Sequence, residues 1–244
     1  MRFIPRIDIK SDYVIKSIRY EGLRNLGKPG DFAKKYNEQG ATEIFLIDCV
    51  SSLYRRDPTF STITSVADQI NIPLTFCGGI SSLEFAKKAF ESGADKIAMN
   101  TALFQNERLI DQIANNFGQQ SVVVSIEAKR INRTTWECYT YNGREKTNTS
   151  VIDWVKKVQD LGAGEIFLSS VDFDGTEQGF DLNLAREVLS IAKIPVVISS
   201  GAASKKHLTD LLLQGTPSGI SLGSALHYDK LKISDLKEVG QNVK

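Results

Sequence analysis

The sequence predicts an α/β fold in which eight strand–helix units close into a (β/α)8 barrel built from two repeated halves. The main evidence is an internal repeat: residues 40–47, GATEIFLI, return as GAGEIFLS, and the two stretches start 122 residues apart (162 − 40). The same separation relates two further pairs of motifs, Ile72-Pro73 with Ile194-Pro195 and Gly79 with Gly201. Doubling one strand–helix–strand–helix half and adding flanking units gives a closed barrel.

Length and composition agree with one barrel. The chain has 244 residues, of which 41% are hydrophobic and 24% charged, so we expect a single domain over residues 1–244. Lys and Arg number 30 against 29 Asp and Glu, and this balance favours neither nucleic acid nor a membrane surface as a partner. The amino terminus lacks a signal-peptide pattern and no stretch approaches the ~20 apolar residues of a membrane span, so we expect a cytoplasmic protein.

The cysteines and histidines indicate neither a metal nor a cofactor. Cys49, Cys77 and Cys138 are odd in number and widely spaced, which fits reduced thiols better than disulfides or a zinc site. His207 is expected on a helix and His227 after the last strand, where both are better explained as structural or solvated residues than as ligands.

The elements of the first half follow in order. Residues 3–10 form the first strand, and the polar residues 11–30 predict a long loop that is either mobile or functional. Asp31 is expected to cap the next helix, and Ser81 the helix that follows the third strand. The remaining elements are a helix at 31–39, a strand at 43–48, a helix at 57–69, and strands at 73–76 and 95–99.

The second half contains an insertion. After a helix at 106–117 and a strand at 122–127, residues 131–149 alternate around Asn142-Gly143, which predicts a β-hairpin after the fifth strand. In this hairpin Trp136 and Tyr139 could pack over a substrate or merely on each other. The later elements are helices at 153–161, 181–192 and 205–214, the last capped by Ser204, strands at 165–171, 195–199 and 218–222, and a closing helix from 234.

Two carboxylates end opposite strands of the predicted ring. Active sites of such barrels lie at the carboxyl ends of the strands, where Asp8 ends the first strand and Glu127 the fifth. Each is followed two positions later by a lysine, Lys10 and Lys129. Such a pair can hold opposite protonation states and serve as acid and base, although each could also be a solvated charge at a strand end.

Two sets of small residues predict anion sites on opposite sides of the same rim. Their backbone N–H groups can face a phosphate, whereas single glycines often only make a turn. The repetition of the set therefore predicts a substrate with a phosphate, or a phosphate-like group, at each end. The first set is Gly78, Gly79, Asn100 and Thr101, and the second is Gly175, Thr176, Gly201, Gly223 and Ser224.

Charged residues suggest two further features. Lys16 lies in the long first loop, which could close over a substrate, although Lys16 could equally be an ordinary surface lysine. Four charges of mixed sign stand at or just before strand starts: Arg2, Glu43, Lys96 and Glu165. They could form a salt-bridged ring at the amino-terminal end of the barrel, a face that usually serves stability.

Five motifs carry a resemblance to a known family. They are IDIK at 7–10, GGI at 78–80, ADK with NT within 94–101, GAGEI at 162–166 and DFDGT at 172–176. Together they closely resemble the cyclase subunit of imidazole glycerol phosphate synthase, a lyase-type synthase, over nearly the whole chain including the inserted hairpin. The related sugar-phosphate isomerase of the histidine pathway shares the doubled barrel, but GAGEI followed by the DGT loop fits the cyclase better.

The resemblance implies an ammonia-using enzyme. A glutaminase partner would dock on the amino-terminal face, and ammonia would pass through the barrel to a phosphate-bearing acceptor at the other end. Asp8 would then be a general acid/base and Lys16 the lysine of a mobile loop. The ring of four charges would gate ammonia, and the residues matching the family's phosphate sites are Gly79, Asn100 and Thr101 on one side and Asp174, Gly175, Gly201 and Ser224 on the other.

Departures from the family pattern point to a changed acceptor. Glu127 stands where the family has its second catalytic aspartate, and its extra methylene moves the carboxylate by about an ångström. Cys77, Ser200 and Ser17 replace glycines, and GKPG at 27–30 replaces a different turn. The pattern resembles cyclase-like paralogues that, with an amidotransferase, make acetamidino groups on nucleotide-linked sugars for surface polysaccharide such as lipopolysaccharide. The histidine-pathway cyclase and a non-catalytic barrel that only activates a glutaminase remain as alternatives.

Overall fold

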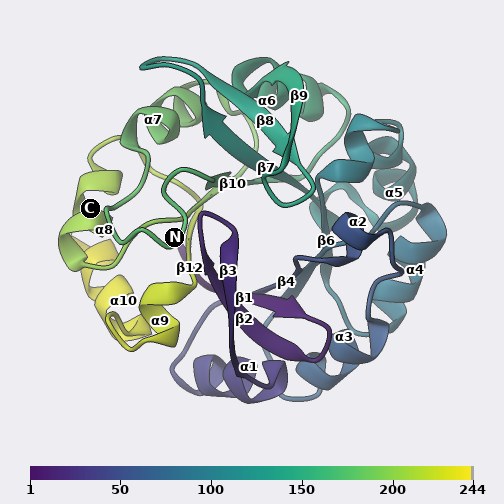
Figure 1. The fold of residues 1–244 in the computed structure, drawn as a ribbon, viewed down its shortest axis with the longest axis horizontal. Helices are drawn as coiled ribbons and strands as arrows, with labels where there is room; N and C mark the ends of the chain where they lie inside the picture. Colours follow the sequence, from purple (N-terminus) through teal and green to yellow (C-terminus); the bar gives the residue numbers. More distant parts are fainter. Residues whose placement is uncertain (243–244) are drawn as a thin grey trace.

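The computed structural model of the chain describes residues 1–242 and shows the predicted closed barrel (Figure 1). Its parallel strands pair with one another around a complete ring, because β7 bonds to β10 as well as to β6. In ring order the strands are β1 (Arg2–Lys10), β4 (Ile44–Asp48), β5 (Leu74–Cys77), β6 (Lys96–Met99), β7 (Val122–Arg130), β10 (Glu165–Ser170), β11 (Val196–Ser199) and β12 (Gly219–Leu222).

Helices surround this ring and cover its outer face (Figure 1). The outer core packs buried aliphatic side chains of the strands against the apolar faces of the helices, as in other α/β barrels. The longer helices are α1 (Pro29–Glu38), α3 (Phe60–Ala67), α4 (Leu83–Glu91), α5 (Leu109–Phe117), α6 (Val151–Asp160), α7 (Leu182–Ile191), α8 (Lys205–Leu212) and α10 (Ile233–Asn242). No helix within residues 1–242 has both the length and the apolar composition needed to cross a membrane.

The barrel interior is filled by side chains in layers. Because successive strand residues face opposite sides, every second residue points inward. The middle layer is apolar and includes Ile4, Val123 and the stacked rings of Phe45 and Phe167, whose centroids lie 3.8 Å apart. Charged and hydroxyl side chains lie above and below this layer, so the apolar plug separates two polar ends.

The prediction of a long loop over residues 11–30 was wrong. These residues form an antiparallel hairpin, β2 (Tyr13–Ile18) and β3 (Glu21–Gly27), which continues from β1 through a turn at Ser11. The prediction failed because the polar residues of this segment hide a buried strand. Val14 and Ile15 are buried as apolar residues, and the polar Lys16 beside them is buried as well because it forms an ion pair. The hairpin lies across the carboxyl-terminal end of the barrel (Figure 1).

Several helix starts also differ from the prediction. Helix α1 begins at Pro29, since proline is pre-organised for a first helical position, and Asp31 lies in its first turn instead of capping it. Helix α4 is capped by Ser82, not Ser81: the Ser82 hydroxyl accepts a hydrogen bond from Phe85 N–H at 3.2 Å. The cap at Ser204 is confirmed. Helix α3 starts at Phe60 instead of residue 57, and two short helices were not predicted, α2 (Ser51–Tyr54) and α9 (Ser224–His227).

The inserted hairpin is confirmed. Strands β8 (Trp136–Thr140) and β9 (Glu145–Ser150) extend from β7, and Asn142 and Gly143 both adopt the positive φ values of a tight turn. The Trp136 indole donates a hydrogen bond to Asp181 Oδ2 at 2.8 Å, so this ring anchors the hairpin to the start of α7. The hairpin tip thereby comes to lie beside the end of β6, at the barrel mouth.

Candidate active site

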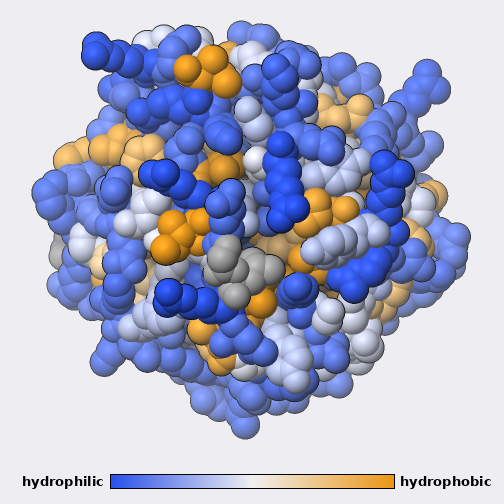
Figure 2. Space-filling view, in the orientation of Figure 1, coloured by the Kyte–Doolittle hydropathy of each residue, from blue (hydrophilic) through white to orange (hydrophobic). Residues whose placement is uncertain are grey.

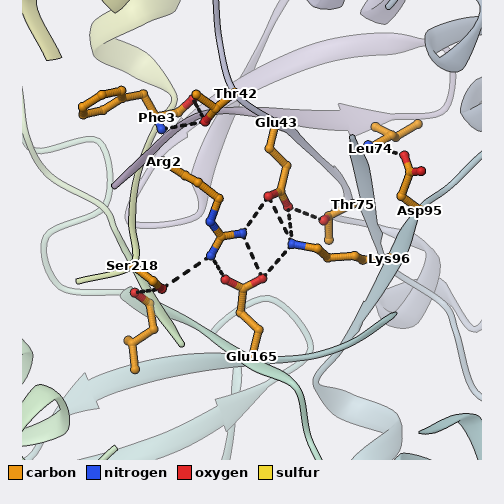
Figure 3. A network of polar contacts seen from close by, with 11 residues as sticks. Arg2, Phe3, Thr42, Glu43, Leu74, Thr75, Asp95, Lys96, Glu165 and Ser218 are labelled. Atoms are coloured by element: carbon orange, nitrogen blue, oxygen red, sulfur yellow. Dashed lines mark hydrogen bonds and ion pairs between the residues drawn. The ribbon is translucent and has the colours of Figure 1, made fainter. Parts of the chain in front are cut away.

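The amino-terminal end of the barrel is closed by the four expected charges (Figure 3). Arg2 pairs with Glu43 at 2.7 Å and also with Glu165. Lys96 bridges the same two carboxylates, at 3.1 Å from Glu43 and 3.0 Å from Glu165. The structure therefore brings all four residues into one ring of alternating sign, which we call the lower ring.

The lower ring is polarised between buried carboxylates and partly solvated cations. Glu43 and Glu165 are buried, while the side chains of Arg2 and Lys96 are 28% and 20% exposed. Burial lowers the pKa of Lys96, and the neighbouring Glu43 opposes this effect. Thr75 donates a further hydrogen bond to Glu43 at 2.6 Å. The cations are the members that can move, since they alone retain contact with water.

A second cluster of four alternating charges lies at the carboxyl-terminal end. Arg6 donates to Asp8 at 2.6 Å and to Asp174 at 2.8 Å, and Lys16 lies 2.8 Å from Asp8 and 3.5 Å from Asp174. All four side chains are at most 5% exposed. We call this cluster the upper quartet. It unites two predicted site residues, Asp8 and Asp174, with the lysine expected on a loop.

The upper quartet fixes the ionisation of Asp8. Burial alone would raise the pKa of this carboxyl group, but the charges of Arg6 and Lys16 outweigh burial and hold the pKa well below its ordinary value. Burial likewise opposes the charge on Lys16, and the two aspartates outweigh it and raise its pKa. Asp8 is therefore a carboxylate throughout the physiological pH range.

Glu127 lies on the opposite strand in a different environment. Burial raises its pKa to about 7, although Gly143 N–H donates a hydrogen bond to Oε2 at 2.7 Å and favours the charged form. Strands β1 and β7 are four places apart in either direction around the ring, so the two carboxyl groups do face each other across the mouth. Asp8 is thus held in its charged form by its cations, whereas burial brings the pKa of Glu127 close to neutrality, so the two carboxyl groups differ in ionisation as an acid and a base in one site would.

The first predicted anion site faces a cavity of about 40 Å³ whose lining includes Gly79, Asn100, Thr101 and Glu127. Three of its polar groups have partners within the chain, whereas Asn100 Oδ1 is buried without one. Gly79 N–H donates to Ser52 Oγ at 3.2 Å, Asn100 Nδ2 donates to Tyr139 O at 2.9 Å, and Thr101 Oγ1 accepts from Tyr141 N–H at 3.1 Å. The inserted hairpin and α2 thus supply partners that a terminal phosphate would otherwise provide.

The second predicted anion site faces a small cavity on the other side of the mouth, whose volume of about 20 Å³ has room for about one water molecule. Its lining brings the expected residues Lys16, Asp174, Gly175, Gly201, Gly223 and Ser224 together with Arg6. The expected Thr176 is not in this lining, and its hydroxyl donates to Phe173 O at 2.8 Å. Ser200, which replaces a family glycine, keeps the left-handed backbone with φ 86° and donates a hydrogen bond to Asp174 at 3.0 Å. Both cations are already paired with Asp8 and Asp174, so the site offers an anion its glycine backbone and no net positive charge.

Two residues with a role in this geometry were missed by the sequence analysis. Arg6 could have been found, because it precedes Asp8 by two positions in one strand and must face the same interior. Ser52 could not, because its contact with Gly79 depends on the unpredicted helix α2. Two expected residues lie apart from both anion sites: Lys10 is exposed at the end of β1, and Lys129 stands over the Tyr139 ring, 5.1 Å from its centroid, and lines the central mouth instead.

The mouth between the two sites is wide and polar. A cavity of about 680 Å³ there is lined by residues that include Tyr20, Tyr54 and three basic residues, Arg19, Lys129 and Arg144. The surface of the molecule in this view is mostly hydrophilic, with only small hydrophobic patches (Figure 2). Such a surface suits a charged or hydroxyl-rich small molecule better than an apolar one.

The sequence was compared with models of known protein families. The model described as histidine biosynthesis protein matches residues 2–232, which is nearly the whole barrel. This match agrees with the resemblance found in the motifs and with the closed barrel of the structure. The chain belongs to the histidine biosynthesis protein family of barrel enzymes.

Proposed function

We propose that this chain is the synthase subunit of a glutamine amidotransferase complex and adds ammonia to a phosphate-bearing acceptor. The observation that carries the proposal is the lower ring, in which Arg2 and Lys96 each bridge Glu43 and Glu165 across the barrel axis. A ring whose cations are 28% and 20% exposed can open for a small neutral molecule, which a layer of packed apolar residues would not do. A glutaminase partner would dock around this face, and the whole chain would act as one cytoplasmic domain.

The acceptor that the mouth favours is a nucleotide-linked sugar, on which the enzyme would form an acetamidino group for surface polysaccharide. Gly79, Asn100 and Thr101 already have internal partners, so a terminal phosphate at this site would have to displace them. Arg6 also fills part of the opposite site. These features support an acceptor without two terminal phosphates.

On this proposal Glu127 exchanges the proton of the reaction and Asp8 provides a fixed negative charge. The raised pKa of Glu127, at about 7, suits a group that gives and takes protons at neutral pH. Asp8, held between Arg6 and Lys16, would stabilise positive charge that develops when ammonia attacks.

The family description favours one alternative, the histidine-pathway cyclase itself. Incubation of the chain with ammonium chloride and the bis-phosphorylated ribonucleotide of that pathway separates the two. Turnover of a few per second or more would identify the histidine-pathway enzyme, whereas turnover only with an acetamido nucleotide sugar supports the proposal.

A non-catalytic barrel that merely activates a glutaminase is tested by Glu127→Gln. The proposal requires a loss of at least about 10²-fold in product formation by the complex, with glutaminase activity retained. Asp8→Asn serves as the second variant, with its folding checked by circular dichroism because Asp8 belongs to the buried quartet. Full product formation in both folded variants would exclude a catalytic role for the mouth.

A further inference from the structure

A large cavity lies outside the first anion site and is not used by the reacting groups. It has a volume of about 410 Å³ and opens between α2, the start of α4 and the tip of the inserted hairpin. It shares Ser52, Gly79 and Thr101 with the 40 Å³ cavity that reaches Glu127. A molecule whose reactive end lies near Glu127 can therefore extend radially into this second space, which we call the outer cavity.

Two arginines line the outer cavity without an acidic partner. Within residues 1–242 neither Arg55 nor Arg56 forms an ion pair or a side-chain hydrogen bond, and Arg56 only lies over the Tyr54 ring, 5.4 Å from its centroid. Asp57 is the one carboxylate in the lining, so the cavity carries a net positive charge. Its charge suits an anionic ligand.

Both arginines lie at the end of α2 and are exposed. Arg55 ends the helix in the left-handed conformation, with φ 51° and ψ 44°. Their guanidinium groups are therefore accessible to a ligand in the outer cavity.

The opposite wall of the outer cavity provides aromatic surface. Tyr141 at the hairpin tip and Phe85 in α4 both line it, and Tyr141 is held in place by the contact of its backbone with Thr101 and of its hydroxyl with Gln105. Aromatic faces opposite paired arginines match the two parts of a nucleotide, a base that stacks and phosphates that accept charged hydrogen bonds. Cavities of this size are typical of small-ligand sites.

We propose that the outer cavity binds the nucleoside diphosphate part of the acceptor, with Arg55 and Arg56 on the diphosphate and Tyr141 and Phe85 beside the base. This inference rests on the proposed function, since it places the sugar end of the same molecule toward Glu127. On this proposal the inserted hairpin takes part in binding the nucleotide, because it contributes Tyr141 to the cavity.

The test measures binding alone, so that its outcome is separate from that of the turnover experiments. Isothermal titration calorimetry with uridine diphosphate and guanosine diphosphate is expected to show binding by the intact chain without ammonia or a glutaminase. The double variant Arg55→Gln/Arg56→Gln should weaken this binding at least tenfold. Arg133→Gln, which removes an exposed arginine at the far end of the hairpin, is the matched control and should leave binding unchanged.

The outcomes separate the sources of affinity. No binding of either nucleoside diphosphate at millimolar concentration, or equal binding by the double variant, overturns the proposal. Equal affinity for inorganic phosphate overturns it as well, because it would show a simple anion site. If the nucleoside diphosphates bind through the two arginines but the chain proves inactive with ammonia, the outer cavity stands and the proposed function fails.

Discussion

The substitution Glu127→Gln tests whether burial keeps a proton on Glu127, the group that we expect to exchange protons at the mouth. Glutamine has the shape of a protonated glutamic acid, and its carbonyl can still accept the hydrogen bond that Gly143 N–H donates at 2.7 Å. In the native protein burial raises the pKa of Glu127 from its ordinary value of 4.5 to about 7. The native state therefore binds a proton that the unfolded state has already released between these two pH values.

The sign and the size of the effect follow from this difference. Since the folded pKa is the higher one, the contribution of Glu127 to stability is complete below pH 4.5 and is lost as the pH rises through about 7. At about 1.4 kcal/mol per pH unit the loss has an upper limit of about 3.5 kcal/mol. Because the carboxyl group lines a cavity that admits water, we expect about 1 to 2 kcal/mol.

The assay is urea denaturation of the wild-type and Glu127→Gln chains at several pH values between 4.5 and 8. Groups common to both chains cancel in the difference between the two free energies of unfolding. Wild type should lose stability relative to the variant across this range, and a Glu187→Gln control on the exposed face of α7 should not reproduce the effect. Parallel stability profiles for wild type and Glu127→Gln would refute the reasoning that burial holds a proton on this group.

Three further predictions concern the backbone of the second anion site and the lower ring. Gly201→Ala should destabilise the chain by at least about 3 kcal/mol in calorimetric melts, because φ is 90° and a Cβ would collide with Gly179 O, whereas Gly223→Ala, whose Cβ would lie 3.3 Å from Lys16 Nζ and 3.4 Å from Arg6 O, should cost less. Similar losses for both would contradict the stated contacts. Ser200→Gly should be more stable than Ser200→Ala by about 1 kcal/mol in urea, since both lose the hydroxyl and only alanine keeps the strain of φ 86°; the reverse order would exclude strain at this position. Lys96→Met should lower the free energy of unfolding by about 2 kcal/mol, because two buried glutamates would share Arg2 alone, and a change below about 0.5 kcal/mol would show that the lower ring is already uncoupled.

The features that could be predicted from the sequence depend on the two-residue period of strands and on the order of strands in the barrel. The internal repeat identified the strands, the strand order placed Asp8 and Glu127 on opposite sides, and the position of Glu43 and Glu165 at equivalent starts predicted the lower ring. These inferences needed only the period of the strands and the closure of the barrel, because both fix where a side chain points.

The features that could not be predicted depend on contacts between distant residues. The local sequence predicts Lys16 to be a loop or surface residue. Its burial depends on Asp174, which lies 158 positions away in the chain. The engagement of Asn100 and Thr101 depends in the same way on hairpin residues about 40 positions later. A polar residue is buried only where partners neutralise it, and local sequence does not contain those partners.

Each charge cluster contains one arginine, one lysine and two carboxylates, but the two clusters differ in their exposure to water. In the lower ring the cations are 28% and 20% exposed, so a cation that leaves its carboxylates regains hydration. In the upper quartet every side chain is at most 5% exposed, and removing Lys16 would leave Asp8 and Asp174 to share Arg6 in a dry environment. On the proposed function, an anion entering the second site is therefore better stabilised by adding to the N–H groups around Gly201 and Ser224 than by drawing Lys16 away from its aspartates. We therefore expect the quartet to stay intact during the reaction and Glu127 to be the group that exchanges the proton.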